Sequence, residues 1–353
     1  MRCPTLNDLP SPPPGKTGWP WTEESPQLPD QMPDGNPWPR ISIVTPSYNQ
    51  GQFIEETIRS VLLQRYPDLE YIVIDGGSTD DSVEIIRKYE PWLAYWVSEK
   101  DRGQANAINK GFRKISGDII GWLNSDDYYT SGGLQIVAIN YITQETQILL
   151  NGATYFIGLG KDRDGVWKSG RVELLPLLFH WKLYKTGPIA IPCQPSVFFS
   201  KELIRNIGIL RTDLHLAMDY EYWLRAMKAG YSFRYIEFVL SFYRFHEESK
   251  SSRGWETFEP EWRWVSDEYI SKLSFKEKIR TRFWLGKTLW LIYRNRIRNN
   301  SEMIISECLN SKNNRKKTLI ILSKIILTDI CILRTRFFWG AIRRVILNLK
   351  YTG

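Results

Sequence analysis

Two adjacent carboxylates, Asp126 and Asp127, are the residues of this chain best placed to do chemistry. They follow the apolar run from Ile119 to Leu123, which is typical of a buried strand, so they stand at its carboxyl end, where open α/β sheets bind ligands. Adjacent unpaired carboxylates repel each other, and a divalent cation that prefers oxygen ligands relieves that cost. A metal bound there could hold a diphosphate. The segment that begins at Asn124 equally suits a plain turn, because its residue types favour turns after strands.

Alternating strand and helix patterns precede the acidic pair and predict the sheet that positions it. Strand patterns cover residues 41–45, 71–75, 94–98 and 118–123. Helical spacing covers 53–62 and 104–115, and Asp81 with Glu84 resembles a capping box that opens a helix reaching Tyr89. Strands and helices that alternate at these lengths predict an α/β fold, with a parallel sheet covered by helices.

Polar loops follow each of these predicted strands and converge on one edge of the sheet. They carry Pro46 and Asn49, Asp75 and Gly77, residues 99–104, and residues 124–127. No Gly-x-Gly-x-x-Gly sequence follows the first strand, and no Gly-x-x-x-x-Gly-Lys-Ser/Thr phosphate loop occurs in the chain. A dinucleotide dehydrogenase and an ordinary nucleoside triphosphatase are therefore disfavoured.

Four motifs occur along these loops in a fixed order. They are Ile-Ser-Ile-Val-Thr-Pro-Ser-Tyr-Asn from Ile41, Ile-Asp-Gly-Gly-Ser-Thr-Asp from Ile74, Glu-Lys-Asp-Arg-Gly-Gln from Glu99, and Leu-Asn-Ser-Asp-Asp from Leu123. In this order and spacing they resemble the family 2 glycosyltransferases of the GT-A fold, over roughly residues 40–250. The resemblance implies a mostly parallel, helix-covered sheet and an inverting enzyme that uses a nucleotide-diphosphate sugar and Mn²⁺ or Mg²⁺.

The resemblance also implies two sets of site residues. One set contacts the base, ribose and diphosphate of the donor: Thr45, Pro46, Asn49, Asp75, Arg102, Asn106, Asn124, Ser125 and Arg244. Within it, Asp75 faces the base and Arg102 lies near the ribose and diphosphate. The second set binds the metal, with Asp126 as the main ligand and Asp127 and His246 as further ligands. The metal would absorb charge on the departing diphosphate.

Two positions depart from the family pattern. The acidic metal motif is commonly Asp-x-Asp, and its first position here is Asn124, so the metal loses one charged ligand, which Asp127 could replace. At Gly76 many relatives have a further Asp that helps to read a uracil. UDP is therefore not assumed as the nucleotide of the donor.

A later helical pattern supplies the expected catalytic base. Residues 213–230 have apolar residues near helical spacing, and Asp219 lies in the first turn. An acid at this point favours the helix by itself. By resemblance, however, Asp219 matches the general base that takes the proton of the acceptor hydroxyl, and we prefer it to Glu221. Gln194, before this helix, either binds a sugar or satisfies a buried turn.

The segment 243–250 resembles the loop that closes over the diphosphate. Arg244 and Lys250 are expected phosphate partners, and His246 is the expected third metal ligand. A lone histidine is more often structural, but its place inside a family motif favours the functional interpretation. Closure of such a loop would exclude water from the donor.

A proline-rich arm precedes the first strand. Residues 4–39 hold 11 of the 19 prolines, so this segment can form neither helix nor ladder and favours an extended conformation. The arm either docks on the domain surface or stays solvated, and we assign it no chemistry.

Cysteine usage and the first residues bear on the compartment. The four cysteines, Cys3, Cys193, Cys308 and Cys331, have no zinc-type spacing and suggest no disulfide framework. The opening residues lack the apolar stretch of a signal peptide. We therefore expect a cytoplasmic protein.

The C-terminal part is strongly basic and rich in apolar clusters. Residues 271–353 hold 19 Lys/Arg against 4 Asp/Glu, whereas the rest of the chain is acidic on balance. No stretch is long and uncharged enough to span a bilayer. Amphipathic helices on the inner membrane surface are expected, with a helical subdomain or partner-binding helices as the alternative. The charge comes with no nucleic-acid-binding motif, so no nucleic acid is expected.

These patterns predict three parts: an arm over 1–39, a GT-A domain over 40–250 and a basic helical extension over 251–353. The expected function is transfer of a sugar from a nucleotide-diphosphate donor to a glycan or lipid-linked acceptor, in cell-envelope or exopolysaccharide synthesis. The enzyme would act on the cytoplasmic face of the membrane. The alternatives are a catalytically inactive nucleotide-sugar-binding scaffold and a sugar-nucleotide pyrophosphorylase.

Overall fold

The computed structural model describes residues 3–141, 147–158, 160, 164–184, 191–289 and 291–292 of the chain. Contacts divide the chain into two units, Met1–Lys272 and Leu273–Gly353. The first unit contains the arm, the sheet and the candidate site. Of the second, the structure describes a helix over residues 275–289, so most of the predicted extension lies outside the described residues.

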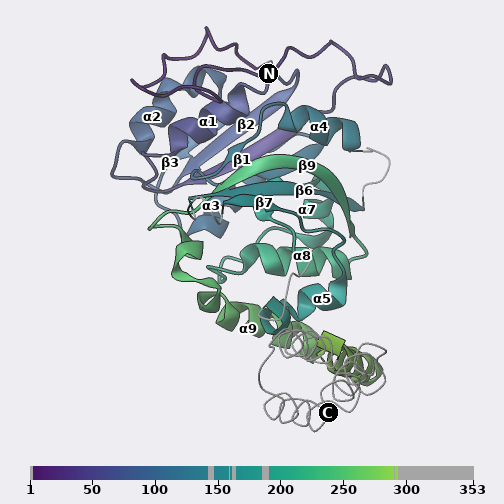
Figure 1. Ribbon diagram of the computed structural model, residues 1–353. Coiled ribbons are helices and arrows are strands. Elements are labelled where there is room, and N and C mark those ends of the chain that lie inside the picture. Colours follow the sequence, from purple (N-terminus) through teal and green to yellow (C-terminus); the bar gives the residue numbers. More distant parts are fainter. Residues whose placement is uncertain are drawn as a thin grey trace, which may run out of the picture. The chain divides into compact units, whose positions relative to one another are not determined.

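The first half of the sheet is parallel, with helices between successive strands. Four strands build it: β1 (Ile41–Ser47), β2 (Leu69–Asp75), β3 (Tyr95–Ser98) and β4 (Ile119–Trp122). They pair in parallel in the order β3-β2-β1-β4 (Figure 1). β1 is buried along its whole length, as in parallel sheets that are covered on both faces. The predicted strands are confirmed, and their carboxyl ends meet at one edge.

The second half continues the sheet with mixed strand directions, which the sequence does not predict. Its strands are β5 (Tyr128–Tyr129), β6 (Ile148–Ile157), β7 (Gly165–Trp167), β8 (Val197–Ser200) and β9 (Ser232–Arg244). β8 is antiparallel to β4 and β6, whereas β6 and β9 are parallel. Within the described residues, nine strands follow the order β3-β2-β1-β4-β8-β6-β9-β5, with β7 beside β6. The pairing of β9 with β5 brings Arg244 back to the acidic loop.

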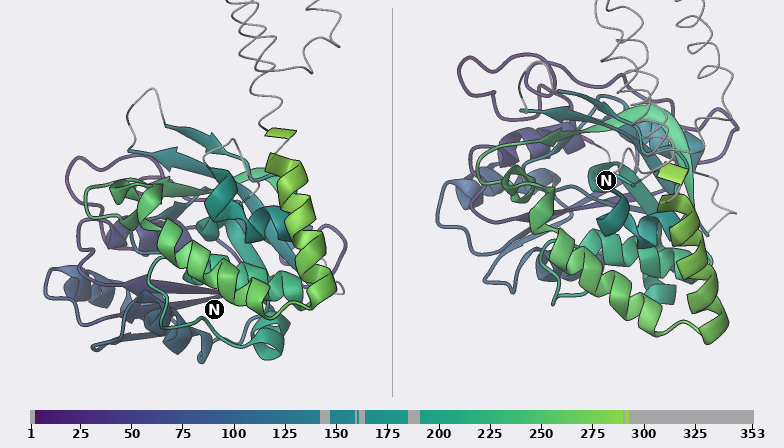
Figure 2. Two further views of the ribbon diagram at one scale, coloured as in Figure 1. Left: turned by 90° about the horizontal axis from the view of Figure 1, so that it is seen from below. Right: turned by 60° about the horizontal axis from the view of Figure 1, so that its bottom comes forward.

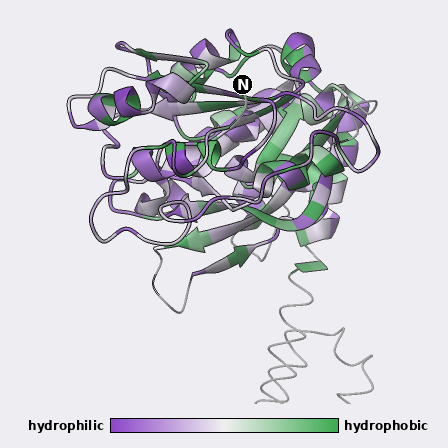
Figure 3. Cartoon of the chain, turned by 90° about the horizontal axis from the view of Figure 1, so that it is seen from above, coloured by the Kyte–Doolittle hydropathy of each residue, from purple (hydrophilic) through white to green (hydrophobic). Residues whose placement is uncertain are grey.

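Helices cover both faces of the sheet. They are α1 (Ile54–Leu62), α2 (Ser82–Lys88), α3 (Gln104–Phe112), α4 (Gly133–Asn140), α5 (Leu174–Leu178), α6 (His180–Leu183), α7 (Lys201–Ile207), α8 (Met218–Lys228) and α9 (Glu259–Ser271). Figure 1 shows α1, α2 and α4 on one side of the sheet and α3, α7 and α8 on the other. Helices that cover a sheet are expected to be amphipathic, and in Figure 3 the surface helices carry both hydrophobic and hydrophilic residues.

One predicted helix start and one predicted helix cap are wrong in detail. The helix expected from residue 213 begins at Met218, because the preceding residues form a loop. The capping box of Asp81 and Glu84 is absent, since Asp81 makes no side-chain cap. Instead the carboxylate of Asp80 accepts the backbone N–H of Ser82 at 3.1 Å, and an acceptor at this position satisfies one of the free donors of a helix start.

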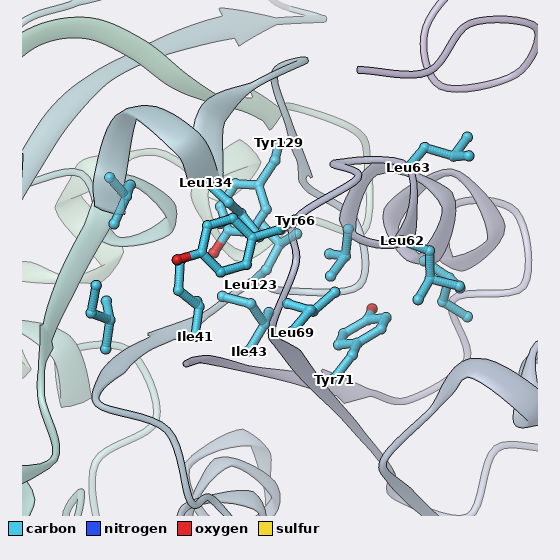
Figure 4. Packing of buried hydrophobic residues seen from close by; sticks show 14 of the residues in the cluster. Ile41, Ile43, Leu62, Leu63, Tyr66, Leu69, Tyr71, Leu123, Tyr129 and Leu134 are labelled. Atoms are coloured by element: carbon cyan, nitrogen blue, oxygen red, sulfur yellow. The ribbon is translucent and has the colours of Figure 1, made fainter. Parts of the chain in front are cut away.

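A dense apolar core lies between α1 and the strands (Figure 4). Ile41, Ile43 and Leu123 are 0% exposed, and Tyr71 is 1% exposed. Burial of an aliphatic or aromatic side chain of this size contributes about 1.5 to 3 kcal/mol. Leu123 directly precedes the acidic loop, so the core fixes the point at which that loop begins.

The proline-rich arm docks on the domain, which settles the alternative left open by the sequence. Arg59 of α1 is 0% exposed, and its guanidinium donates to the carbonyl oxygens of Pro10, Pro20 and Trp21 at 2.8 to 3.0 Å. The indole of Trp19 donates to the carbonyl of Tyr129 at 2.8 Å. A buried charge needs such partners, because it loses its hydration. Arm and domain therefore share one core.

The compact unit extends beyond residue 250, where the sequence places the end of the domain. α9 packs on α6 and α8, and the first unit therefore runs to Lys272. Figure 2 shows α9 from two further directions. Among the described residues, no helix combines the length and apolar character that a bilayer crossing requires.

Candidate active site

A cavity of about 670 Å³ opens at the edge where the carboxyl ends of β1, β2, β3 and β4 meet, which is a size typical of ligand pockets. Its remaining walls come from segments 212–215 and 248–250. The predicted site residues that line it are Pro46, Arg102, Asn124, Ser125, Asp126 and Asp127. The others lie behind or beside the cavity wall: Thr45, Asn49, Asp75, Asn106, Asp219, Arg244 and His246.

Asp126 is the more accessible of the two adjacent carboxylates. Its Oδ2 lies 3.1 Å from Nε2 of His246, so the structure brings these two predicted metal ligands together. The imidazole of His246 packs on the ring of Phe53 at 4.5 Å between centroids, which fixes its orientation. A histidine and a carboxylate in contact at the mouth of a cavity are suitable ligands for a divalent metal.

Asp127 is committed to the protein interior. It is 1% exposed, and its Oδ1 accepts the backbone N–H of Arg244 at 3.0 Å. Burial, together with the neighbouring charge of Asp126, raises the pKa of Asp127 well above its ordinary value. Asp127 therefore anchors the acidic loop to the end of β9.

Within the described residues, no group of three or more His, Cys, Asp or Glu side chains has the geometry of a metal site. Asp126 and His246 fit a metal as two ligands, whereas Asp127 is held by Arg244. A Mg²⁺ ion is commonly bound by one or two carboxylates together with substrate phosphates, so a pair of protein ligands is chemically sufficient for a metal that binds with a diphosphate.

Arg244 supports the acidic loop rather than facing the cavity. Its guanidinium pairs with Glu56 of α1 at 2.9 Å, where the two side chains are 12% and 17% exposed. It also stacks over the rings of Phe53 and Tyr128, at 4.7 and 5.1 Å from their centroids. These contacts join α1, β5 and β9 directly behind the acidic loop.

The hydroxyl of Thr57 holds the same loop from α1. Its Oγ1 lies 2.9 Å from the carbonyl oxygen of Ser125 and 2.7 Å from that of Asp127, within donating distance of both. The hydroxyl of Ser60 accepts the N–H of Tyr129 at 3.1 Å. Since Thr57 and Ser60 are 0% exposed, the loop rests on a dry and polar face of α1.

The loops after β1 and β2 are braced by residues that the sequence assigns to the nucleotide. The carboxylate of Asp75 is buried and accepts the N–H groups of Gly77 and Ser78 at 3.0 and 2.9 Å, with the hydroxyl of Ser98 at 2.6 Å. Asn49 has a left-handed backbone, and its Oδ1 accepts the N–H of Thr79 at 2.9 Å. Both side chains shape the loops from behind.

Thr45 and Asn106 have similar supporting positions. The hydroxyl of Thr45 is buried beside that of Tyr71, with the two oxygens 3.0 Å apart. Asn106 lies in α3, and its Oδ1 accepts the backbone N–H of Arg102 at 3.4 Å. Arg102 itself is exposed on the cavity wall and keeps its guanidinium available to an anionic ligand.

Two cavity residues near Gly76 were not predicted. Tyr48 is 59% exposed on the cavity wall, and a side chain added at Gly76 would meet Oδ2 of Asp101 at 2.7 Å. The carboxylate of Asp101 thus occupies the space that an acidic side chain at position 76 would fill. The missing Asp at Gly76 was the signal in the sequence, but the closeness of Asp101 becomes visible only when the loops after β2 and β3 are placed together.

Asp219 lies in the first turn of α8, as predicted, close to the cavity-lining residue Lys250. Burial raises its pKa above the ordinary value, and the positive charge of Lys250 opposes this shift. Lys250 lines the cavity and donates to Oε1 of Gln104 at 2.7 Å and to the carbonyl of His215 at 2.8 Å. Asp219 and the acidic loop therefore share Lys250 as a neighbouring cation.

Glu261 of α9 holds the start of α8 and was not predicted. One carboxylate oxygen accepts the N–H groups of Leu216 and Ala217 at 2.8 and 2.9 Å, and both oxygens lie 3.1 Å from the N–H of His215. A carboxylate satisfies the free donors at a helix start and interacts favourably with its dipole. No motif in the sequence connects α9 to this position.

Comparisons with known proteins identify the class of this fold and site. A model described as "Glycosyl transferase family 2" matches residues 42–208. The chain is 34% identical to an uncharacterized glycosyltransferase of Mycobacterium tuberculosis, over 53% of this chain and 69% of that protein. It is 26% identical to the putative teichuronic acid biosynthesis glycosyltransferase TuaG of Bacillus subtilis, over 64% of this chain and 86% of that protein.

A solved structure shows the same fold. The mannosyltransferase PcManGT of Pyrobaculum calidifontis superposes with a TM-score of 0.51 and 18% identity, over 94% of this chain and 92% of that one. The chain thus has the GT-A fold of a glycosyltransferase. It belongs to glycosyl transferase family 2, which confirms the resemblance noted in its motifs.

Proposed function

We propose that this chain is an inverting, metal-dependent glycosyltransferase. It would move a sugar from a nucleotide-diphosphate donor to a glycan or lipid-linked acceptor in cell-envelope or exopolysaccharide synthesis. The observation that carries the proposal is the contact of Asp126, on the cavity wall, with His246, together with Asp219 close to Lys250 of the same cavity. The name of TuaG supports the acceptor class, and the GDP-Man and Mn²⁺ bound by PcManGT support the donor class and the metal.

The reaction needs a proton acceptor and charge compensation. The acceptor hydroxyl oxygen would attack the anomeric carbon as the bond from that carbon to the diphosphate breaks, and the hydroxyl proton would pass to the carboxylate of Asp219. Attack from the face opposite the leaving group inverts the anomeric carbon. A metal held by Asp126 and His246 would supply positive charge at the departing diphosphate. Arg102 and Lys250 add fixed positive charge on the cavity wall.

We place the enzyme at the cytoplasmic face of the membrane. In the second unit, Phe275, Ile279 and Phe283 are 80%, 51% and 74% exposed, and their spacing puts them on one face of the helix over 275–289. Basic residues surround this face in the sequence, and such helices bind anionic bilayers. Flotation with phosphatidylglycerol vesicles, but not with phosphatidylcholine vesicles, is the expected result. Equal flotation with both, or with neither, would contradict this part of the proposal.

The transferase itself is tested by thermal shift with UDP-, GDP-, dTDP- and CMP-sugars, each with and without Mn²⁺. A ligand that binds only the folded state raises the melting temperature with the logarithm of its concentration. A metal-dependent shift with one nucleotide would support the proposal and name the base. A folded protein without any shift would favour the inactive scaffold, and release of nucleoside triphosphate in the presence of pyrophosphate would favour the pyrophosphorylase.

A further inference from the structure

A continuous chain of hydrogen-bonded side chains runs from the cavity wall into the protein interior. Nζ of Lys250 donates to Oε1 of Gln104 at 2.7 Å, and Nε2 of Gln104 donates to Oδ1 of Asn124 at 2.6 Å. Nδ2 of Asn124 then donates to Oε1 of Gln194 at 3.2 Å, and Nε2 of Gln194 donates to the carbonyl of Trp122 at 2.6 Å. We call these four side chains, with the Trp122 carbonyl, the amide relay.

The amide relay has one possible direction. A lysine ammonium can only donate, and a backbone carbonyl can only accept, so both ends of the relay are fixed. Each amide between them must therefore turn its oxygen toward Lys250 and its nitrogen toward Trp122. The middle position, residue 124, needs a side chain that accepts on one side and donates on the other. Asparagine does this, whereas an ionised aspartate only accepts.

We infer that Asn124 is a positioning residue of this site and that a carboxylate at position 124 is incompatible with it. An aspartate would place an acceptor against Oε1 of Gln194, at the present 3.2 Å, and a charge against Oδ2 of Asp127, at the present 3.5 Å. Gln194 cannot turn over, because its nitrogen already serves the Trp122 carbonyl. Buried acceptors that face each other without a proton cost the full desolvation of both groups.

The relay joins loops that are distant in the sequence. Gln104 begins α3, Asn124 begins the acidic loop, Gln194 precedes β8, and Lys250 follows β9. Gln194 is 8% exposed, so the inner end of the relay is shielded from water. The relay thereby fixes the spacing between the acidic loop and the cation at residue 250. The change from Asp to Asn in the common Asp-x-Asp motif is therefore a structural requirement of this chain rather than a lost ligand.

The test restores the common motif with Asn124→Asp. We expect the melting temperature of the metal-free protein to fall by about 4 °C or more, since a loss of 1 kcal/mol shifts a domain of this size by about 2 to 4 °C. Titration with MnCl₂, alone and with UDP or GDP, should give an affinity no higher than that of the wild type. Asn7→Asp, an amide-to-acid change at an exposed position of the arm, is the matched control and should keep the wild-type melting temperature.

Either an unchanged melting temperature or tighter Mn²⁺ binding in Asn124→Asp would overturn the inference. If Asn124→Asp does not fold, Gln194→Glu removes the last donor of the relay and should lower the melting temperature more than Asn7→Asp does; an equal or smaller effect would also overturn it. Only the titration with MnCl₂ rests on the proposed function. If the protein binds no nucleotide but shows the predicted melting temperatures, the inference about the relay stands and the proposed transferase function is rejected.

Discussion

The two walls of the cavity are held in different ways. The acidic loop, residues 124–127, rests on Thr57 and is fixed to β9 by the backbone of Arg244, and these supports are buried. The second wall, residues 212–215 with the turn that leads to Asp219, has exposed residues and is held by two side chains from later in the chain, Lys250 and Glu261. Supports that are dry resist local opening more than supports that water can replace.

This difference suits a transferase with two substrates. The wall that carries Asp126, which we propose to hold a metal with His246, is fixed by buried contacts, and such preorganisation would favour stabilisation of a departing diphosphate. The wall that leads to Asp219 includes exposed residues, so we expect it to adjust when an acceptor enters. We expect substitutions behind the first wall to lower stability, and substitutions on the second wall to change catalysis or acceptor use.

The largest expected effect is that of Asp219→Asn. Loss of a general base slows a reaction by about 100- to 10,000-fold, so turnover should fall within this range. Nucleotide binding, measured by thermal shift, should stay at the wild-type level because the acidic wall is unchanged. Glu221→Gln is the control, since Glu221 pairs with Arg225 at 2.8 Å on the side of α8. Near-normal turnover of Asp219→Asn would show that Asp219 is not the general base.

The pH dependence of the reaction gives a second test of the same wall. Burial raises the pKa of Asp219 above its ordinary value of 3.8, and only the ionised carboxylate can accept a proton. Activity should therefore fall as the pH drops through this raised pKa, so the acid limb of kcat/KM should lie above pH 3.8. In Asp219→Asn this limb should disappear from the residual activity. A limb that persists unchanged would assign it to another group.

A smaller effect on stability is expected from Thr57→Val behind the acidic loop. Valine keeps the shape of the side chain but leaves the carbonyl oxygens of Ser125 and Asp127 without this donor, at a cost of about 1 to 3 kcal/mol. Urea unfolding measures this cost. Thr57→Ser retains the hydroxyl and should lose less. Equal losses in the two variants would show that the methyl packing, rather than the hydrogen bond, supports the loop.

The smallest expected effect is that of Glu261→Gln on the second wall. An amide can still accept from Leu216 and Ala217, but it loses the favourable charge at the start of α8, worth about 0.3 to 1 kcal/mol. We expect an increase in KM for the acceptor with little change in the melting temperature. Glu268→Gln, which also lies on α9 and loses its pair with Arg211, is the control. A larger effect on donor binding than on the KM for the acceptor would contradict the claim that the second wall serves the acceptor.

The sequence predicts the first half of the fold because its strands and helices have local patterns. The strands at 41–45 and 71–75 and the helix at 53–62 are present within a few residues of their predicted bounds. The mixed second half has no such local signal, because the pairing of β6 with β9 joins segments about eighty residues apart. Long-range pairing is decided by tertiary packing.

The sequence predicts only part of the candidate site, as it predicts only part of the fold. Motif positions locate Asp126 and His246 correctly beside each other, and Asp219 in the first turn of a helix. The motifs do not distinguish a side chain that lines the cavity from one that braces a loop, as Asp75 does. Glu261 could not be found, since its role depends on α9 packing against α8.

The docked arm has a consequence for the order in which the chain can fold. The ribosome releases the arm before the residues that it contacts: Arg59 lies 39 residues after Pro20, and Tyr129 lies 110 residues after Trp19. Until α1 emerges, the tryptophans of the arm have no surface to cover, and α1 without the arm exposes the guanidinium site of Arg59. Contacts of such sequence separation form slowly, so the nascent chain passes through a stage in which its first tryptophans are open to chaperones or to other chains.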